Sequence, residues 1–349
     1  MRTDLLDYQL PTGLIAQHPS AERDGSRLLC VTRQRCAHHS MRDWAELVPQ
    51  NSLVVLNDTR VMRARLLGTR ASGGRVEVLL LRPILDESDG QDWEAFARPL
   101  KRLYPGALLS FGPLSARVIE RMDERRVLLR LQAEQGSIQA AIEAVGHVPL
   151  PPYMQRAATD ADRDRYQTVF AKDLGSVAAP TASLHLTESA LSTLRSRGVE
   201  VATLTLHVGP GTFRPVSQDN LEDHDMHSER FRLPIPTRDA IARARARGAK
   251  VVAVGTTVVR ALEAASDPER PGQVLSQDAE TDILIQPDYA FRVVDALLTN
   301  FHMPRSTLLA LVAAFAGLER TLSAYRTAIK SEYRFLSYGD AMWIPERLT

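Results

Sequence analysis

Apolar and polar positions alternate in three different ways along this chain of 349 residues. Leu53 to Leu56 form one continuous apolar run, which is typical of a strand buried on both faces of a sheet. From about residue 61 to residue 148, short β-type runs follow one another between turn signals such as Gly73-Gly74 and Pro105-Gly106. Short strands at this spacing predict a small antiparallel barrel or sandwich, closed by one helix over about 137–144. The predicted strands are 76–81, 93–97, 116–120 and 126–131.

Helices and strands alternate after the proline-rich stretch at 149–152. The pattern predicts helices over 187–197, 237–247 and 305–316, and strands over 250–255, 282–285 and 293–298. Such alternation favours an α/β sheet. The strand at 53–56 fits the same sheet, so we predict an α/β domain made of residues 1–60 and 149–349. The antiparallel β-barrel domain, residues 61–148, is then an insertion.

Composition and charge narrow the class of protein. Hydrophobic residues make up 44% of the chain and charged residues 24%, which allows a sizeable core. The net charge of +1 argues against a uniformly basic nucleic-acid binder. However, residues 60–130 carry 14 Lys and Arg against 9 Asp and Glu. This basic segment is either a contact for nucleic acid or a solvated surface, and the sequence does not separate the two.

The location of the protein is also predicted from the sequence. Two cysteines, Cys30 and Cys36, are too few for a disulfide framework or a cysteine-ligated metal. Asp4 and Asp7 precede any apolar run, so no signal peptide is expected. The longest apolar run, 307–318, is shorter than the ~20 residues that span a bilayer. We expect a cytoplasmic monomer without membrane contact.

Two loops of small residues are the strongest candidates for a ligand site. The first is Ala178-Ala179-Pro180-Thr181-Ala182-Ser183, and the second, His207 to Phe213, closes a strand with Gly209 and Gly211. Open α/β sheets bind their ligands where strand ends and helix starts face one crevice. The two loops are therefore predicted to shape a cleft.

Other polar motifs each allow a functional and a structural interpretation. Asn57 to Arg60 either hold a polar ligand or start a turn. Residues 254–260 form a strand, a turn and a helix start, which suit an anion or carboxylate but also a plain helix cap. His224 and His227 suggest a metal, yet no zinc spacing is present, so acid–base or hydrogen-bonding histidines are favoured. The aromatic and cationic residues of 147–153 and 164–172 suit unstacked RNA bases or a stiff linker. The polar aromatic residues of 333–342 fit either a core or a site edge.

Together these segments resemble one family, the S-adenosylmethionine:tRNA ribosyltransferase-isomerases of queuosine biosynthesis. The resemblance covers essentially the whole chain. Its motifs are Leu14-Ile15-Ala16-Gln17, Glu22-Arg23-Asp24, Leu56 to Arg60, Gly74 to Leu80, His147 to Tyr153, Arg165 to Thr168, Ser176 to Thr181, His207 to Val216, Met226 to Glu229, Val254 to Thr257, Thr299-Asn300-Phe301-His302 and Tyr338 to Met342.

The resemblance implies a fold and a reaction. The family fold is an α/β domain that carries a smaller β-barrel. The reaction moves the ribosyl part of S-adenosylmethionine, a co-substrate, to the aminomethyl group of 7-aminomethyl-7-deazaguanine at the tRNA wobble position. Adenine and methionine leave, and epoxyqueuosine-tRNA is formed. No metal is expected.

Roles for individual residues follow as hypotheses from this chemistry. The acid–base group comprises His207, His227 and Glu229. A carboxylate or ribose hydroxyls would be bound by Thr256, Thr257 and Arg260, with Thr181 and Thr212 also binding substrate. The modified base would meet Asp58 and Arg60, and the phosphate backbone would meet Arg214.

Three positions depart from the family pattern, and two other functions compete. Ser183 and Leu186 stand where Gly and Phe are expected, and Pro210 replaces a smaller residue; a positive φ at position 183 would strain a serine. The competitors are a metal-dependent nucleotide hydrolase that uses His224 and His227, and a non-catalytic RNA-binding module that uses the basic barrel.

Overall fold

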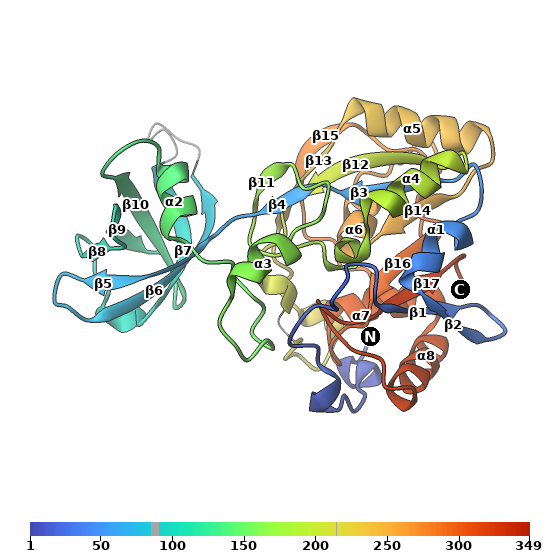
Figure 1. The fold of residues 1–349 in the computed structure, drawn as a ribbon, viewed down its shortest axis with the longest axis horizontal. Helices are drawn as coiled ribbons and strands as arrows, with labels where there is room; N and C mark the ends of the chain where they lie inside the picture. Colours follow the sequence, from blue (N-terminus) through green and yellow to red (C-terminus); the bar gives the residue numbers. More distant parts are fainter. Residues whose placement is uncertain (85–90, 214) are drawn as a thin grey trace.

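The computed structural model describes residues 1–84, 91–213 and 215–349, which form two lobes joined by a narrow connection (Figure 1). The larger lobe contains a nine-stranded mixed sheet in the order β15-β13-β12-β3-β14-β16-β17-β1-β2. Its strands are β1 (Arg27–Val31), β2 (Cys36–Ser40), β3 (Leu53–Asn57), β12 (Glu200–Leu206), β13 (Glu229–Leu233), β14 (Val251–Val254), β15 (Gln277–Thr281), β16 (Ala296–Asn300) and β17 (Ala341–Ile344).

Four central strands, β12, β3, β14 and β16, run parallel to one another. The apolar run of β3 is buried on both faces: Leu53 and Val55 belong to one core cluster, and Val54 and Leu56 to the other. Alternate side chains of a strand point to opposite faces, so a strand covered on both faces needs an unbroken apolar run. The pattern at 53–56 therefore correctly predicted a central strand.

Helices cover both faces of this sheet. One core cluster includes residues of α5 (Ile235–Ala246), α6 (Thr256–Ala264), α7 (Thr307–Ala316) and α8 (Leu318–Lys330). The other face is covered by α1 (Trp44–Leu47) and α4 (Glu188–Ser196). No single helix in the described ranges could cross a membrane; α7 and α8 meet the criteria only as a pair, and that pair bends by 112°.

The smaller lobe is a closed antiparallel barrel in the order β10-β7-β6-β5-β8-β9. It lies between β3 and β12 in the sequence, so it is an insertion into the α/β fold, as predicted. Its own core is separate from that of the sheet. The lobe consists of β5 (Arg65–Arg70), β6 (Arg75–Pro83), β7 (Asp92–Arg98), β8 (Leu108–Ser110), β9 (Leu114–Arg121), β10 (Arg126–Ala133) and the helix α2 (Ile138–Val145). The exact domain boundaries at residues 60 and 149 stay a prediction.

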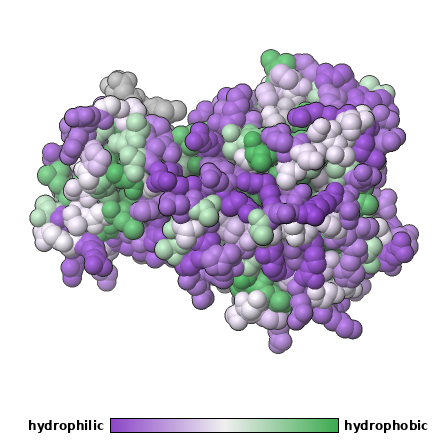
Figure 2. Space-filling model, viewed as in Figure 1, coloured by the Kyte–Doolittle hydropathy of each residue, from purple (hydrophilic) through white to green (hydrophobic). Residues whose placement is uncertain are grey.

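A small parallel pair, β4 (Thr59–Val61) and β11 (Asp173–Ser176), lies between the two lobes, with α3 (Asp160–Arg165) nearby (Figure 1). The barrel surface differs from that of the larger lobe. On the face shown in Figure 2, hydrophobic residues gather on the barrel, and its exposed apolar side chains include Leu67, Tyr104 and Leu108.

Two predicted strands need correction. Residues 282–285 are not a strand: β15 ends at Thr281, and the carbonyl oxygen of Ile283 accepts a hydrogen bond from Arg260 instead of from a neighbouring strand. The strand predicted over 293–298 begins at Ala296 and ends at Asn300. Residues 293 and 294 do not pair with a neighbouring strand; instead, the backbone amides of Val293 and Val294 donate to the buried carboxylate of Glu263.

Candidate active site

The carboxyl ends of the central strands are tied together by one buried amide, that of Asn57 at the end of β3. Its Oδ1 accepts from the Thr59 and Leu206 amides at 3.1 and 3.0 Å. Its Nδ2 donates to the Leu206 carbonyl at 2.9 Å and to Thr257 Oγ1 at 3.3 Å. All the polar capacity of this side chain is thus used inside the protein, and the motif at 57–60 is in part a structural turn.

The two loops of small residues lie side by side at this edge of the sheet. Ala178 and Val208 form an antiparallel bridge, and the Val177 amide donates to the Val208 carbonyl at 3.1 Å. Ser176 Oγ fixes the pairing because it accepts from the Val208 amide at 2.8 Å and donates to the Ala178 carbonyl at 2.7 Å. The predicted common cleft requires the two loops to be neighbours, and this pairing makes them so.

A cavity opens between these loops and the start of α6. This threonine cavity holds about 400 Å³ of space, counting the part open to solvent. Gly255, with φ of 93°, turns the chain from β14 into α6, and no side chain among the described residues caps the helix. The free N–H groups and positive dipole end of α6 therefore face a site for an anion. The lining residues are Ala179, Pro180, Thr181, Ala182, Val208, Gly255, Thr256, Thr257, Thr299, Asn300, His302 and Leu308.

Two further cavities adjoin the threonine cavity, and Leu308 in the first turn of α7 borders all three. The aromatic cavity is lined by Tyr153, Thr181, Asn300, Phe301, His302, Met303, Ser306, Leu308, Leu336 and Ser337. The histidine cavity is lined by Gly211, His224, Met226, His227, Glu229, Arg260, Ile283, Leu284, Ile285, Thr307, Leu308 and Leu311. The threonine and aromatic cavities also share Thr181, Asn300 and His302.

A buried ion pair joins Glu229 of β13 to Arg260 of α6. The Arg260 side chain is 7% exposed and that of Glu229 is 3% exposed. Arg260 also donates to the carbonyls of Thr281 and Ile283, both at 3.3 Å. Glu229 Oε1 accepts from the Gly209 amide at 2.9 Å. The pair therefore anchors the second loop to the helix while bordering the histidine cavity.

His207 and His227 differ in their surroundings. His207 Nδ1 is 2.9 Å from Thr59 Oγ1, and a Cβ at position 175 would come within 2.8 Å of its ring, so Gly175 leaves the space it needs. Burial, followed by the nearby Arg230 charge, lowers the pKa of His207. The ring of His227 is exposed and lies against Gly211, where a Cβ would come within 2.0 Å of its Cδ2 atom.

Asp58 lies beside a second carboxylate. Asp58 Oδ1 is 2.7 Å and Asp173 Oδ2 3.0 Å from the Thr205 hydroxyl, and Arg232 pairs with Asp173 at 2.6 Å. Arg60 in β4 is exposed. The side chain of Thr212, within the 3-10 helix Pro210–Phe213, and Arg214 as a whole lie outside the described residues.

The remaining motifs are now located. His224 and His227 both border the histidine cavity, but the described parts of the chain contain no group of three His, Cys, Asp or Glu placed to hold a metal. In the linker, Tyr166 is fully buried, which leaves it no face for an RNA base. Ser183 does not have a positive φ, so its backbone does not carry the strain that a left-handed conformation would cause. Tyr333 and Phe335 are core residues.

Sequence reasoning assigned no role to Asn300 and His302, which the structure places around the cavities. His302 Nε2 lies 2.8 Å from Thr299 Oγ1, and burial lowers its pKa to about 3. The available signal was the run Thr299 to His302 at the end of a predicted strand. Polar residues that follow a buried parallel strand point to the ligand edge of the sheet.

Comparisons with known proteins agree with this geometry. The family profile described as "Queuosine biosynthesis protein" matches residues 3–344. An S-adenosylmethionine:tRNA ribosyltransferase-isomerase of Sorangium cellulosum (strain So ce56) is 52% identical over 99% of this chain and 98% of its own length. Its counterpart in Anaeromyxobacter sp. (strain Fw109-5) is 49% identical over 98% of each chain. The crystal structure of S-adenosylmethionine tRNA ribosyltransferase from Thermotoga maritima, 34% identical, covers 97% of this chain and 99% of its own with a TM-score of 0.53.

Proposed function

This chain belongs to the queuosine biosynthesis protein family, and from this premise we propose that it is an S-adenosylmethionine:tRNA ribosyltransferase-isomerase. It transfers and isomerises the ribosyl moiety of S-adenosylmethionine onto the aminomethyl group of 7-aminomethyl-7-deazaguanine in the tRNA anticodon. Epoxyqueuosine-tRNA forms, and adenine and methionine leave. The observation that carries the proposal is the match to such enzymes over nearly the whole length of the chain.

The reaction makes four demands on the site. The sulfonium cation acidifies the neighbouring ribose carbon, so a base must remove a proton there. The adenine that leaves needs a hydrogen bond or a proton. The methionine carboxylate needs a site for an anion, and the tRNA nucleotide must be turned out of its stack to reach the ribose.

The threonine cavity suits the methionine carboxylate or the ribose hydroxyls. The first turn of α6 offers free N–H groups, and Thr256 and Thr257 add hydroxyl groups at the same helix end. Thr181 borders the cavity from the opposite loop. We assign these three threonines to substrate binding, together with Thr212.

His207 and His227 remain the candidates for acid–base work, in unequal positions. His227 is exposed and borders a cavity, so it is open to both a substrate and water. The low pKa of His207 keeps its imidazole neutral near pH 7, and a neutral imidazole can accept a proton. Glu229 and Arg260 neutralise each other, so we assign them to positioning the second loop.

The tRNA base fits the edge between the lobes. Asp58 and the exposed Arg60 lie on the short connection that leads from β3 to the barrel. A carboxylate there suits the amine donors of an aminomethyl-deazaguanine, and an arginine suits a phosphate or a base edge. We keep Arg214 as a candidate phosphate contact. The protein is proposed to act as a monomer, which size-exclusion chromatography with light scattering would test.

The decisive experiment supplies the protein with S-adenosylmethionine and tRNA that carries the aminomethyl-deazaguanine, and measures free adenine. Adenine release that needs both substrates supports the proposal. A metal-dependent hydrolase would release adenine without this tRNA and would lose activity with a chelator. An RNA-binding module would bind the tRNA and release no adenine.

A further inference from the structure

A buried acceptor at the edge of two cavities has no donor in the described part of the chain. Asn300, the last residue of β16, is 2% exposed and borders both the threonine cavity and the aromatic cavity. Its Oδ1 atom is buried and makes no hydrogen bond with any of the residues that the structure describes. Leaving a buried acceptor unsatisfied costs free energy, so such an atom beside a cavity indicates a missing donor.

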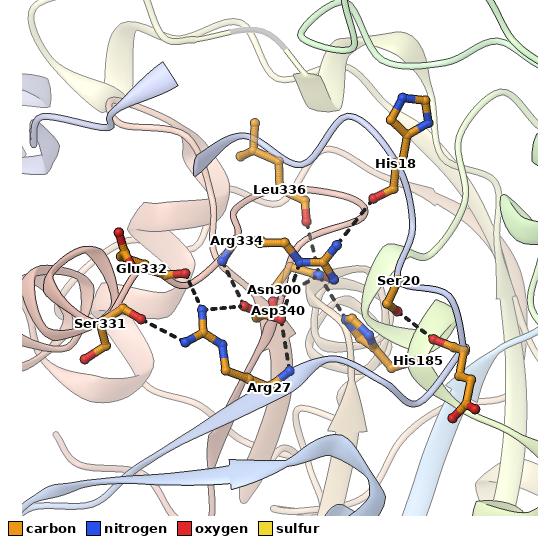
Figure 3. Close-up of polar contacts among 11 residues, drawn as sticks. His18, Ser20, Arg27, His185, Asn300, Ser331, Glu332, Arg334, Leu336 and Asp340 are labelled. Atoms are coloured by element: carbon orange, nitrogen blue, oxygen red, sulfur yellow. Dashed lines mark hydrogen bonds and ion pairs between the residues drawn. The ribbon is translucent and has the colours of Figure 1, made fainter. Parts of the chain in front are cut away.

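The orientation of this amide is set by its other end (Figure 3). Nδ2 lies 3.2 Å from the Leu336 carbonyl and 3.4 Å from the Asp340 carbonyl. Carbonyl oxygens only accept hydrogen bonds, so a flipped amide would set its oxygen against two others. His185 Nε2, 3.2 Å from Nδ2, accepts as well in the neutral tautomer that carries its proton on Nδ1. Burial, with the charges of Arg334 and Arg23, lowers the His185 pKa to about 4, which keeps it neutral near pH 7.

The turn that supplies these carbonyls is itself held in place. The buried Asp340 carboxylate accepts from the Arg27 and Arg334 amides at 2.9 and 2.8 Å. Figure 3 shows Asn300 next to this network, between His185 and the turn. Asn300 therefore cannot rotate to satisfy Oδ1 without giving up its donors.

The surroundings of Asn300 fit a flat aromatic ligand that carries an amine. The exposed lining of the aromatic cavity is mostly apolar, and its apolar residues include Tyr153, Phe301 and Leu336; Asn300 is one of its polar residues. Apolar walls with a few placed polar groups are typical of sites for small planar ligands. Oδ1 accepts only, so the matching group on the ligand is a donor.

We propose that the aromatic cavity is the adenine subsite and that Asn300 Oδ1 accepts a hydrogen bond from the exocyclic amine of adenine. This rests on the proposed function, which supplies an adenine nucleoside as substrate. Asn300 is then the residue that distinguishes adenine from purines without a 6-amino group. The threonine cavity next to it would hold the ribose and methionine parts.

The test measures equilibrium binding of free adenine, purine and 2-aminopurine to the full-length protein by dialysis. Wild type should bind adenine about tenfold more tightly than the other two bases, because only adenine offers the donor at this position. Asn300→Ala should bring the three affinities within about twofold of each other. Gln286→Ala is the matched control, because Gln286 Oε1 is also a buried acceptor without a partner among the described residues, but Gln286 borders none of the three cavities.

Two results would overturn the proposal: equal binding of the three bases to wild type, or a tenfold adenine preference that persists in Asn300→Ala. If that variant does not fold, Asn300→Ser replaces it, and thermal melting shows which of the two is folded. If neither folds, the wild-type series decides alone. These outcomes are separable from the proposed function, which fails only if wild type does not release adenine from S-adenosylmethionine with the modified tRNA.

Discussion

Replacing Glu229 by Gln tests whether the buried ion pair holds the second loop in place. The change keeps the size of the side chain but leaves the Arg260 guanidinium, 7% exposed, without its counter-charge. Removing one partner of a buried pair costs about 3–5 kcal/mol. The carbonyls of Thr281 and Ile283 still accept from Arg260, so the lower end of this range, about 3 kcal/mol, is expected. At about 2 °C per kcal/mol for a large domain, Tm should fall by about 6 °C.

The assay follows unfolding of the α/β lobe by the fluorescence of Trp44 and Trp343, which pack edge to face there with ring centroids 6.0 Å apart. Trp93 belongs to the barrel core and is replaced by Phe in every variant. The double variant E229Q/R260M should recover about 2 kcal/mol, because a neutral pair of similar size removes the uncompensated charge. A catalytic base would behave differently: an unchanged Tm with a kcat for adenine release lowered about 100-fold would refute the reasoning.

Three further predictions concern substrate binding, pH and RNA. Replacing Thr256 and Thr257 by Val should raise KM for S-adenosylmethionine about tenfold per lost hydrogen bond in adenine-release kinetics, and KM for tRNA should not change. Burial lowers the pKa of His185 to about 4 and of His302 to about 3, from 6.5. The unfolded chain therefore takes up protons that the native protein does not. Above pH 6.5 these two histidines should not affect the free energy of unfolding. From pH 6.5 down to 4 that free energy should fall by about 1.4 kcal/mol per pH unit for each histidine. Urea titrations of His302→Gln should show a smaller slope. The basic turn of the barrel, Arg98, Lys101 and Arg102, is exposed and forms no ion pair within the described residues. Reversing its charges should raise KM for tRNA and leave KM for S-adenosylmethionine unchanged. The same charge reversal at Lys330 on α8 is the control.

The elements that could be predicted are those whose buried and exposed faces can be read from the spacing of apolar residues within the element itself. The run at 53–56 and the alternating segments of the barrel are examples, because their periods directly report which faces are covered. The short strand β8 and the segment of β5, Arg65–Arg70, escaped prediction since they carry only a few inward-facing apolar residues. Residues 282–285 were wrongly predicted as a strand because their apolar run looks like one. In the structure this run lines the histidine cavity with Arg260, and the Ile283 carbonyl accepts from Arg260.

The sequence identified candidate site residues, but it did not predict which of them contact one another. The loops at 178–183 and 207–213 stand out by composition, and both do meet at one crevice. That Glu229 neutralises Arg260 depends on β13 lying next to α6, a contact between residues 31 apart in the chain. Likewise, the missing donor at Asn300 is visible only once the Leu336 and Asp340 carbonyls are placed.

The topology explains why these distant segments meet. From β3 the chain passes through the barrel and returns as β12 on one side of β3, and β14 is added later on the other side. The strand order therefore diverges at β3, and such a divergence leaves a crevice at the carboxyl ends of the parallel strands. Asn57 closes the end of β3 at this place, and the barrel is inserted three residues beyond the short strand β4. The insertion therefore starts at the edge of the sheet that holds the small-molecule crevice, so a large nucleic-acid substrate can contact the barrel and still reach that crevice.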